Sequence, residues 1–257
     1  MKPNQTLKEV HGIFGSRFMA PMPDPHIGGV IQKDSVRELQ LTTAILAACH
    51  GKKRFVDVGA NIGWHTVLAG IKNPRMEIHA FEPHPETYHI LCENLRINGG
   101  MEHTMAWEVG AGDTHTEVEM FEHPESLGGS QPWARADWPG AEKKIIQIRR
   151  LDSGGLPLAS GPVDVMKMEV QGYEVKALKG CAGLRIDTLF IVYAPRMIKG
   201  AGDDPRELLA MLRTRFRSVE RIDAKTGLCG LREDELDRAA AKGDIAVFFD
   251  LVCRGPK

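Results

Sequence analysis

Two acidic residues flank a glycine-rich turn in the first third of the chain. Asp57 lies inside an apolar run and is followed by Gly59-Ala60-Asn61-Ile62-Gly63, while Glu82 ends the next apolar run, 23 residues after Gly59. Glycines at such a turn let a ligand approach the backbone, and a helix that begins there offers free N–H groups. A carboxylate at the end of the second run can accept hydrogen bonds from both hydroxyls of a ribose. The pair of features therefore predicts a site for a nucleoside-containing ligand.

The spacing of the glycines narrows the choice of ligand. It is G-x-N-x-G, whereas dinucleotide-binding loops typically have G-x-G-x-x-G, so a pyrophosphate cofactor is not indicated. A shorter loop with a carboxylate in the preceding strand suits an adenosyl amino acid, because its amino group needs a negative charge nearby. A nicotinamide oxidoreductase is an alternative, which preferential binding of NAD would support. A tight turn and a solvated strand end are the alternatives for the two features taken singly.

Alternating strands and helices place these residues at one edge of a sheet. Short apolar runs predict buried parallel strands, with helical patterns between most of them. This alternation is typical of a doubly wound α/β sheet, in which ligands bind at the carboxyl ends of the strands. The predicted strands are 55–59, 77–81, 106–109, 163–168 and 188–193, with closing strands at 219–222 and 245–253 and a charged helix at 233–242.

Two segments depart from this alternation. Residues 1–34 are punctuated by glycine and proline and predict an irregular N-terminal cap, after which a helix with Asp34 or Ser35 as its N-cap opens the main domain, 35–257. Residues 113–150 predict an insertion of two half-exposed antiparallel strands around a long loop, because 116–121 and 144–149 alternate polar and apolar residues.

Composition excludes several classes of protein. The chain has 33 Lys and Arg against 34 Asp and Glu, a balance that argues against nucleic-acid binding carried by phosphate contacts. Five widely spaced cysteines form neither a disulfide framework nor a zinc motif, and they fit a reducing, cytoplasmic compartment. No apolar run predicts a secretory signal or a membrane span. The acidic and histidine residues at 115–123 alternate between two strand faces, so no metal site is expected there.

Three motifs together resemble the FkbM family of S-adenosylmethionine-dependent methyltransferases. They are Val56-Asp57-Val58-Gly59-Ala60-Asn61-Ile62-Gly63, Phe81-Glu82-Pro83 and the run from Asp164 to Glu174, which is followed by Leu178-Lys179-Gly180. The third motif is the specific one, and the similarity extends over about 38–253. The resemblance implies a Rossmann-like sheet of seven strands, mostly parallel, with the last strand antiparallel and helices on both faces.

The resemblance also implies roles for individual residues. S-adenosylmethionine would be held at its methionine end by Asp57, Gly59, Asn61 and Gly63, and at its ribose by Glu82. Asp113 would border the adenine. Glu38 matches an acidic residue upstream of the first motif and would close the donor site, with an exposed helix glutamate as the alternative reading.

Departures from the family pattern fall on the acceptor side. The aspartate of the third motif is Glu169 here, and the glutamate that follows it is Gln171. The E-x-H-P sequence that often follows the fifth strand is Val192-Tyr193-Ala194-Pro195. These changes leave donor binding intact as a prediction and leave the acceptor chemistry open.

Methyl transfer to a hydroxyl benefits from a base beside the acceptor. Glu169 is the first candidate because it ends the strand of the third motif, although it could instead shape the donor pocket. His65 is the second candidate, with a helix-surface histidine as the alternative. Residues 1–34 and 123–140, which include Trp133 and Trp138, are expected to line the acceptor cavity.

The resemblance predicts O-methylation of a hydroxyl on a sugar or other natural product. N-methylation within the same family and a non-catalytic module that binds an adenosyl ligand are the alternatives. The expected partner is a small-molecule acceptor, with neither a nucleic acid nor a membrane, and the sequence leaves the oligomeric state open.

Overall fold

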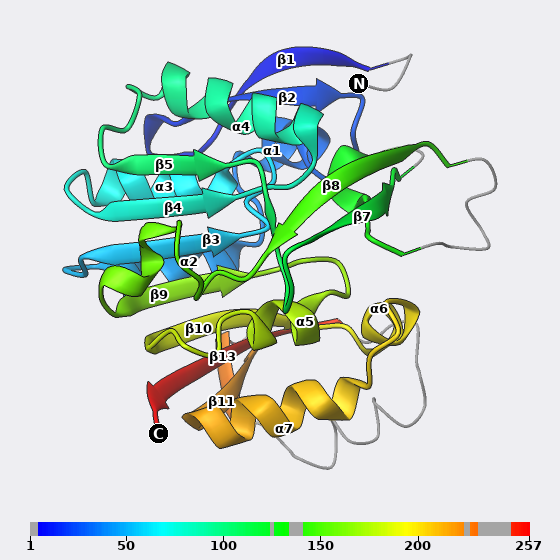
Figure 1. The fold of residues 1–257 in the computed structure, drawn as a ribbon. Helices are drawn as coiled ribbons and strands as arrows, with labels where there is room; N and C mark the ends of the chain where they lie inside the picture. Colours follow the sequence, from blue (N-terminus) through cyan, green and yellow to red (C-terminus); the bar gives the residue numbers. More distant parts are fainter. Residues whose placement is uncertain (1–4, 124–125, 134–140, 224–226, 231–247) are drawn as a thin grey trace.

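The computed structural model describes residues 5–123, 126–133, 141–223, 227–230 and 248–257. Its central sheet contains β3 (Arg54–Val58), β4 (Glu77–Phe81), β5 (Thr104–Trp107), β9 (Val163–Met168), β10 (Ile186–Tyr193), β11 (Phe216–Asp223), β12 (Gly227–Gly230) and β13 (Phe249–Pro256). The strand order is β12-β11-β13-β10-β9-β3-β4-β5 (Figure 1). The strands from β10 to β5 in this order are parallel, whereas β13 is antiparallel to both β10 and β11. The α/β prediction with an antiparallel last strand is confirmed, and β12 adds a short edge strand.

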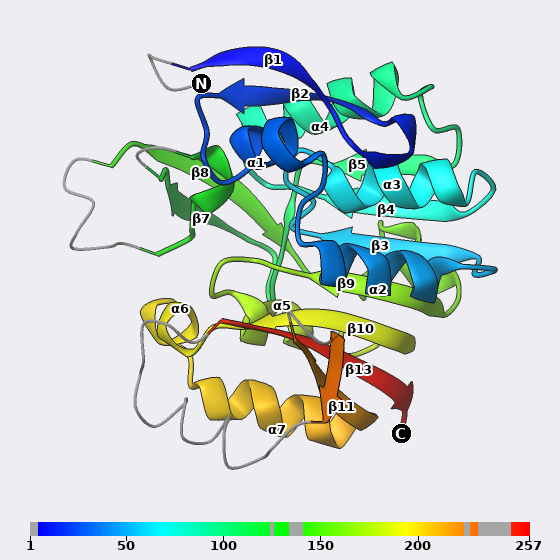
Figure 2. The same cartoon turned by 180° about the vertical axis from the view of Figure 1, so that it is seen from behind.

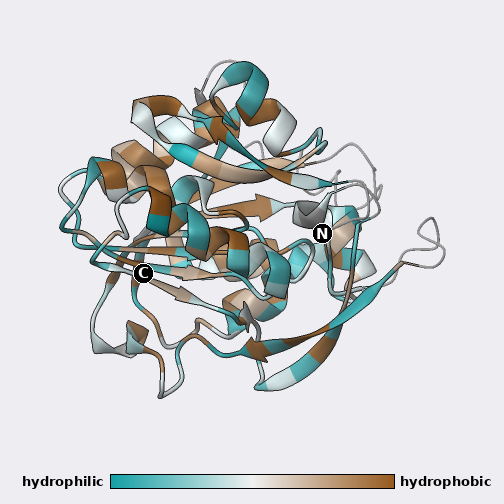
Figure 3. Ribbon diagram, turned by 90° about the horizontal axis from the view of Figure 1, so that it is seen from above, coloured by the Kyte–Doolittle hydropathy of each residue, from teal (hydrophilic) through white to brown (hydrophobic). Residues whose placement is uncertain are grey.

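Helices cover both faces of the sheet (Figures 1 and 2). On one face Ile45 of α2 (Leu39–Cys49) packs in a core with Phe55 and Phe190, and α3 (Trp64–Lys72) joins it. On the other face α5 (Glu174–Lys179) and α7 (Pro205–Arg215) share a core with Met166 and Leu189. Burial on both sides explains why β3 and β9 are apolar along most of their length. Figure 3 shows this difference between strands and helices: the central strands are coloured mostly as hydrophobic, whereas the helices carry both hydrophobic and hydrophilic residues.

The helix that follows Glu82 begins at a well-defined cap. In α4 (Pro85–Ile97) proline occupies the first turn, and the His84 side chain accepts a hydrogen bond from the backbone N–H of Thr87. The same logic starts α7, where Asp204 caps the helix ahead of Pro205. A further short helix, α6 (Pro195–Gly200), follows β10 and was not predicted.

The prediction that residues 1–34 are irregular is wrong. The segment forms an antiparallel hairpin of β1 (Thr6–His11) and β2 (Arg17–Met22), followed by α1 (Gly28–Asp34). Asp34 therefore ends a helix instead of starting one, and Ser35 takes the left-handed conformation that closes it. Neither strand has a period-two pattern, because the apolar residues of β1, Leu7 and Val10, are three residues apart and β2 is apolar at every position after Arg17. The hairpin packs on α4, to which its backbone is tied by the Asn94 side chain at Met19.

The insertion forms a small sheet of its own. Its strands β6 (Gly110–Ala111), β7 (Thr116–Phe121) and β8 (Lys143–Arg149) lie in the order β6-β8-β7, with β7 and β8 antiparallel as predicted. Figure 1 shows this hairpin projecting beyond the carboxyl ends of the central strands. Trp138 and the helix predicted at 233–242 lie outside the described residues.

Candidate active site

A cavity of about 360 Å³ opens at the carboxyl ends of β3, β4 and β9. Its walls come from the loops after these strands, from the segment before α2, and from the β7–β8 hairpin with its loop. Ligands of open α/β sheets bind at this edge, and small-molecule sites commonly have volumes of about 300–1,000 Å³. The residues from the sequence analysis that line it are Glu38, Gly59, Asn61, His65, Glu82 and Glu169.

The glycine turn after β3 is held by close backbone packing. Gly59 has a positive φ of 77°, and a Cβ atom there would lie 1.9 Å from the carbonyl oxygen of Glu169. Gly63 has a φ of 90°, and its Cβ would lie 2.6 Å from the Leu91 side chain. Both positions therefore require glycine. The tight fit at Gly59 brings the β3 and β9 loops together at the floor of the cavity, whereas Gly63 fits against Leu91 of α4.

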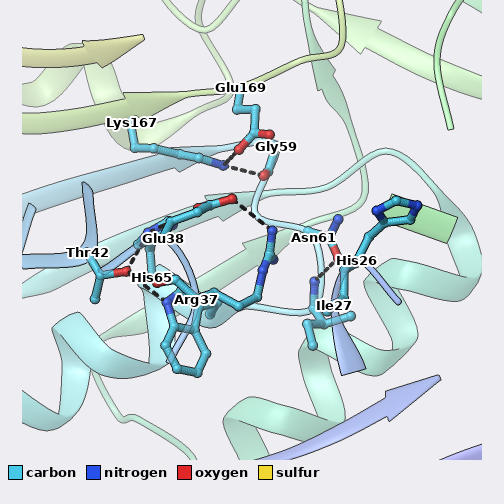
Figure 4. A network of polar contacts seen from close by, with 12 residues as sticks. His26, Ile27, Arg37, Glu38, Thr42, Gly59, Asn61, His65, Lys167 and Glu169 are labelled. Carbon is cyan, nitrogen blue, oxygen red and sulfur yellow. Dashed lines mark hydrogen bonds and ion pairs between the residues drawn. The ribbon is translucent and has the colours of Figure 1, made fainter. Parts of the chain in front are cut away.

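Lys167 is the charged centre of this floor (Figure 4). Its ammonium donates a hydrogen bond to the carbonyl oxygen of Gly59 at 2.6 Å and lies 3.4 Å from Asp57 Oδ1 and 3.6 Å from Glu169 Oε2. Burial by itself would lower the pKa of Lys167, but Asp57, Glu169 and Glu38 more than offset this effect and the pKa is raised. Lys167 therefore stays charged and fixes the positions of the Asp57 and Glu169 carboxylates.

Asp57 supports the glycine turn from below. Its second oxygen accepts a hydrogen bond from the Thr66 hydroxyl of α3 at 2.7 Å, and its side chain is buried. Asp57 thus joins β3, α3 and Lys167, and it lies outside the cavity lining.

Glu82 is buried at the end of β4 and faces the turn. Its two oxygens accept backbone N–H hydrogen bonds from Asn61 and His84, each at 2.9 Å. Burial raises the pKa of Glu82 to about 7 even though these two N–H groups favour the charged form. The carboxylate that the sequence assigned to ribose is therefore already oriented by the protein backbone.

The segment before α2 brings opposite charges to the cavity. Arg37 donates a hydrogen bond to Glu38 at 2.9 Å, and both residues line the cavity (Figure 4). The Thr42 hydroxyl donates to the carbonyl of Arg37 and accepts from the indole N–H of Trp64, which fixes this turn. Burial lowers the pKa of His65 to about 4, and its Nε2 lies 3.3 Å from the Thr42 hydroxyl. His65 is thus a buried neutral side chain and not the helix-surface histidine of the alternative reading.

Two segments remote in sequence meet above the cavity. Asp24 accepts backbone N–H hydrogen bonds from His26 and Ile27, and it accepts another from the Ser126 hydroxyl at 2.8 Å. The rings of His26 and His123 meet edge to face with their centroids 5.9 Å apart, and both residues line the cavity. The N-terminal segment and the insertion loop are thereby joined into one wall.

The insertion loop is anchored at its far end as well. The indole N–H of Trp133 donates to the carbonyl of Gln171 at 2.9 Å, and a Cβ at Gly200 of α6 would lie 2.5 Å from the indole ring. Gln171 itself has a positive φ of 55° and lines the cavity beside Tyr173. Trp133 therefore packs against the loop of the third motif.

A buried pair links the loop after β4 to the insertion. His84 Nε2 lies 3.1 Å from Glu122 Oε1, and both side chains are buried. Because His84 Nδ1 accepts from the backbone N–H of Thr87, the proton of a neutral His84 ring lies on Nε2 and points at Glu122. Lys144 Nζ lies 3.7 Å from the same Glu122 oxygen.

Some predicted site residues lie away from the cavity. Gly63 and Asp57 support its floor without lining it. Asp113 does not line it either, and its carbonyl accepts a hydrogen bond from Arg150. The assignment of Asp113 to adenine stays a prediction. Sequence reasoning missed Arg37, His84, Glu122 and Lys167. The available signal for Lys167 was its position inside an apolar strand, because a buried lysine requires charged partners.

Comparison with known proteins identifies the family. Residues 57–217, more than half of the chain, match the profile of the methyltransferase FkbM domain. The chain belongs to the FkbM methyltransferase family. The resemblance of the motifs around Asp57, Glu82 and Glu169 to this family is therefore confirmed.

Two curated relatives of this FkbM-family chain are methyltransferases. It is 26% identical over 164 residues to the hexuronic acid methyltransferase AglP of Haloferax volcanii, covering 64% of this chain and 63% of that protein. It is 26% identical over 152 residues to methyltransferase sdnD of Sordaria araneosa, covering 49% of this chain and 59% of that protein. The matches thus span less than two thirds of either relative. A solved structure of methyltransferase FkbM from Methylobacillus flagellatus KT has 18% identity and a TM-score of 0.44, covering 78% of this chain and 43% of that one.

Two other features, a membrane-spanning helix and a metal-binding group, are absent from the described residues. No helix among them has the length and apolar character needed to cross a membrane. Within the same ranges, no three His, Cys, Asp or Glu side chains converge as a metal-binding group.

Proposed function

We propose that this chain is an S-adenosylmethionine-dependent O-methyltransferase that acts on a hydroxyl of a sugar or other small natural product. The observation that carries the proposal is that Glu82, the Gly59 turn and Glu169, from the ends of β4, β3 and β9, line one cavity of about 360 Å³. The FkbM family membership and the two curated methyltransferases support the reaction type. The hexuronic acid methyltransferase among them supports a sugar acid as acceptor.

The residues present fit the proposed donor. Gly59 lacks the Cβ that would collide with the β9 loop, so the turn packs closely on that loop. The backbone of the turn lines the cavity, where the donor's methionine part would lie against it. Glu82 presents a carboxylate for the ribose hydroxyls, and Glu38 offers negative charge for the amino group. Arg37 lines the cavity next to Glu38 and provides the positive charge that a carboxylate of the donor requires.

The donor would supply an electrophilic methyl group. The bond from the methyl carbon to the acceptor oxygen forms as the carbon–sulfur bond breaks, and the electron pair of the broken bond stays on sulfur. The acceptor hydroxyl loses its proton. The role of the chain is to align the reactants, which supplies much of the rate in such displacements. Glu169 is the group proposed to receive the acceptor hydroxyl and its proton. Lys167 holds this carboxylate at the cavity wall.

His65 is the weaker candidate for the base. Its pKa of about 4 leaves it neutral but a poor proton acceptor at neutral pH, and its Nε2 faces the Thr42 hydroxyl. The walls contributed by His26, His123 and Gln131 are proposed to select the acceptor. Loops of this kind carry variable specificity on a rigid scaffold.

Labelled methyl transfer tests the proposal. The chain should transfer the methyl group of S-adenosylmethionine to glucuronic or galacturonic acid glycosides, or to related sugars in an acceptor panel. Glu169→Gln keeps the shape and hydrogen bonding of the side chain but cannot take up the proton, so turnover should fall by about 10²–10⁴ while donor affinity changes little. A parallel loss of donor affinity would show that Glu169 shapes the donor pocket instead. Absence of any binding of S-adenosylmethionine or its demethylated product would refute the proposed function.

A further inference from the structure

Gln131 is a buried glutamine in the cavity wall, 1% exposed, at the point where the insertion loop meets the end of β7. Its backbone N–H donates to the carbonyl of Phe121 at 3.0 Å, and its own carbonyl accepts from the N–H of Phe121 at 2.8 Å. Its side-chain Nε2 donates to the carbonyl of Trp133 at 3.3 Å. The backbone and the nitrogen of the side-chain amide are therefore both fixed.

The oxygen of this amide is available to a ligand. Because Nε2 is the donor in the bond to Trp133, Oε1 is the other branch of the amide, and it accepts no hydrogen bond from any described residue. Buried polar atoms are nearly always hydrogen-bonded in folded proteins, and an unpaired one costs free energy. Since Gln131 lines the cavity, a bound molecule can supply the missing donor.

The chemistry of an amide oxygen restricts that donor. The oxygen only accepts hydrogen bonds, so its partner must carry a proton to donate. A hydroxyl group meets this requirement, whereas an ionised carboxylate offers only acceptor oxygens and cannot pair with it. At Gln131 the preferred group is therefore a hydroxyl of the ligand, even when the ligand also carries an acid group.

Trp133 connects Gln131 to a second amide that lines the cavity. The indole N–H of Trp133 donates to the carbonyl of Gln171 at 2.9 Å, and Gln171 is two residues after Glu169. Gln171 has a φ of 55°, a left-handed conformation that costs free energy for a residue other than glycine. Such strain concentrates at functional sites. The side-chain amide of Gln171 bonds to no described residue, so it too can contact a ligand.

We propose that Gln131 and Gln171 form a subsite for a second hydroxyl of the acceptor, so that the acceptor is a polyhydroxylated ring and not a molecule with a single hydroxyl. This inference rests on the proposed function and narrows its substrate class. Glu169 receives the hydroxyl that is methylated, and Oε1 of Gln131 accepts a hydrogen bond from another hydroxyl. The Gln171 amide, which can both donate and accept, contacts the same molecule, so the two amides orient the ring without adding charge.

Deoxy sugars test the subsite in the chain saturated with S-adenosylhomocysteine. The probes are the methyl glycosides of glucuronic acid, galacturonic acid and glucose, each with its mono-deoxy analogues, titrated by calorimetry. At least one parent sugar should bind. Removal of one of its hydroxyls should weaken binding by about 5- to 150-fold, because the analogue excludes water from Oε1 of Gln131 without supplying a donor.

Variants then assign the discrimination to these residues. Gln131→Met is similar in length but lacks the oxygen, so the parent sugar and that deoxy analogue should bind equally, while affinity for S-adenosylhomocysteine changes little. Gln147→Met is the matched control, because Gln147 of β8 is exposed, bonds to Glu117 and does not line the cavity.

Gln171→Gly separates ligand binding from a structural role. The substitution removes the amide together with the backbone strain, since glycine adopts a positive φ readily. Sugar binding should weaken by about 2- to 12-fold, while the melting temperature is not lowered. A residue with a structural role alone would leave sugar binding unchanged.

Each outcome decides the question. Equal binding of every parent sugar and its analogues, binding of no sugar, a requirement for an amino group in place of the hydroxyl, or undiminished discrimination in Gln131→Met would overturn the subsite. Equally efficient methyl transfer to an acceptor with a single hydroxyl would overturn it and leave the proposed function in place. Failure of the wild-type chain to bind S-adenosylmethionine or S-adenosylhomocysteine would refute the proposed function and this inference with it. Gln131→Leu provides a second apolar variant if Gln131→Met does not fold.

Discussion

Glu82→Gln removes the carboxylate on which the proposed ribose site depends. In the wild-type chain both oxygens of Glu82 accept backbone N–H hydrogen bonds, from Asn61 and from His84. The glutamine amide has one oxygen, so in the variant one of these N–H groups faces an NH₂ group. The ribose hydroxyls also lose a charged acceptor. The change thus disturbs the turn and the ligand contact together.

The loss of hydrogen bonds to a charged acceptor sets the magnitude. Such bonds contribute about 1.5–3 kcal/mol, so affinity for S-adenosylhomocysteine should fall about 10- to 150-fold. The pKa of Glu82, about 7, adds a pH dependence. Because ribose hydroxyls donate to the ionised form, wild-type affinity should decrease about tenfold per pH unit below pH 7. Glu82→Gln has no proton to bind and should lack this decrease.

The same pKa acts on folding. The folded-state pKa of Glu82 lies above its ordinary value of 4.5, so the folded state holds a proton that the unfolded chain releases between these two values. The stability from this group is present below about pH 4.5 and is lost as the pH rises to about 7, which amounts to about 3 kcal/mol. Glu82→Gln should show a flatter dependence of unfolding free energy on pH in this window.

Calorimetry and chemical denaturation measure both effects. Titration with S-adenosylhomocysteine from about pH 5.5 to about pH 8.5 avoids the sulfonium charge, which would act on every nearby carboxylate, and the difference between the wild-type chain and Glu82→Gln isolates Glu82. Glu93→Gln is the matched control, since Glu93 is a carboxylate of the adjoining helix α4 that pairs with Arg96 away from the cavity. Equal affinity and equal pH dependence in wild-type and Glu82→Gln proteins would refute the ribose assignment.

Three further substitutions test the supports of the site. Gly59→Ala should destabilise the fold by at least about 3 kcal/mol in thermal melts, because its Cβ would lie 1.9 Å from a backbone carbonyl, whereas Gly51→Ala meets no atom within 4 Å and should cost about 1 kcal/mol. Glu122→Ala removes the partner of the buried His84 side chain, which adjoins Glu82, and should weaken the affinity for S-adenosylmethionine measured by calorimetry. Glu119→Ala, on the exposed side of β7, should leave that affinity unchanged. Thr42→Val removes a buried hydroxyl that bonds to two groups and should cost about 1–3 kcal/mol in unfolding free energy.

Local sequence was sufficient to predict the central strands and the donor-side motifs. Apolar runs such as 77–81 coincide with β4 because buried parallel strands must be apolar on both faces. The Gly59 turn and Glu82 could be recognised because both sit where strand becomes loop, and chain order alone brings the ends of β3 and β4 to one edge. The alternation of 116–121 likewise predicted a hairpin with one exposed face.

The two strands of the N-terminal hairpin could not be predicted from the local sequence pattern. The strands β1 and β2 are six residues long, and their pairing depends on contacts between segments that the sequence pattern does not link. The end of α1 at Asp34 was mistaken for the start of a helix because acidic and hydroxyl residues occur at both kinds of boundary. Tertiary packing on the N-terminal hairpin, where Ile27 and Ile31 join one core with Phe18 and Ala20, decides which one is formed.

The sequence by itself determined the resemblance to the FkbM family, the order of the main strands along the chain and the motifs that line or support the cavity, because these depend on residues within short stretches. Only the tertiary structure brought Asp24 to Ser126, His84 to Glu122 and Lys167 to Gly59. Each of these pairings joins residues more than thirty positions apart, so their charges and hydrogen bonds act on one another only after the sheet has formed and excluded water between them.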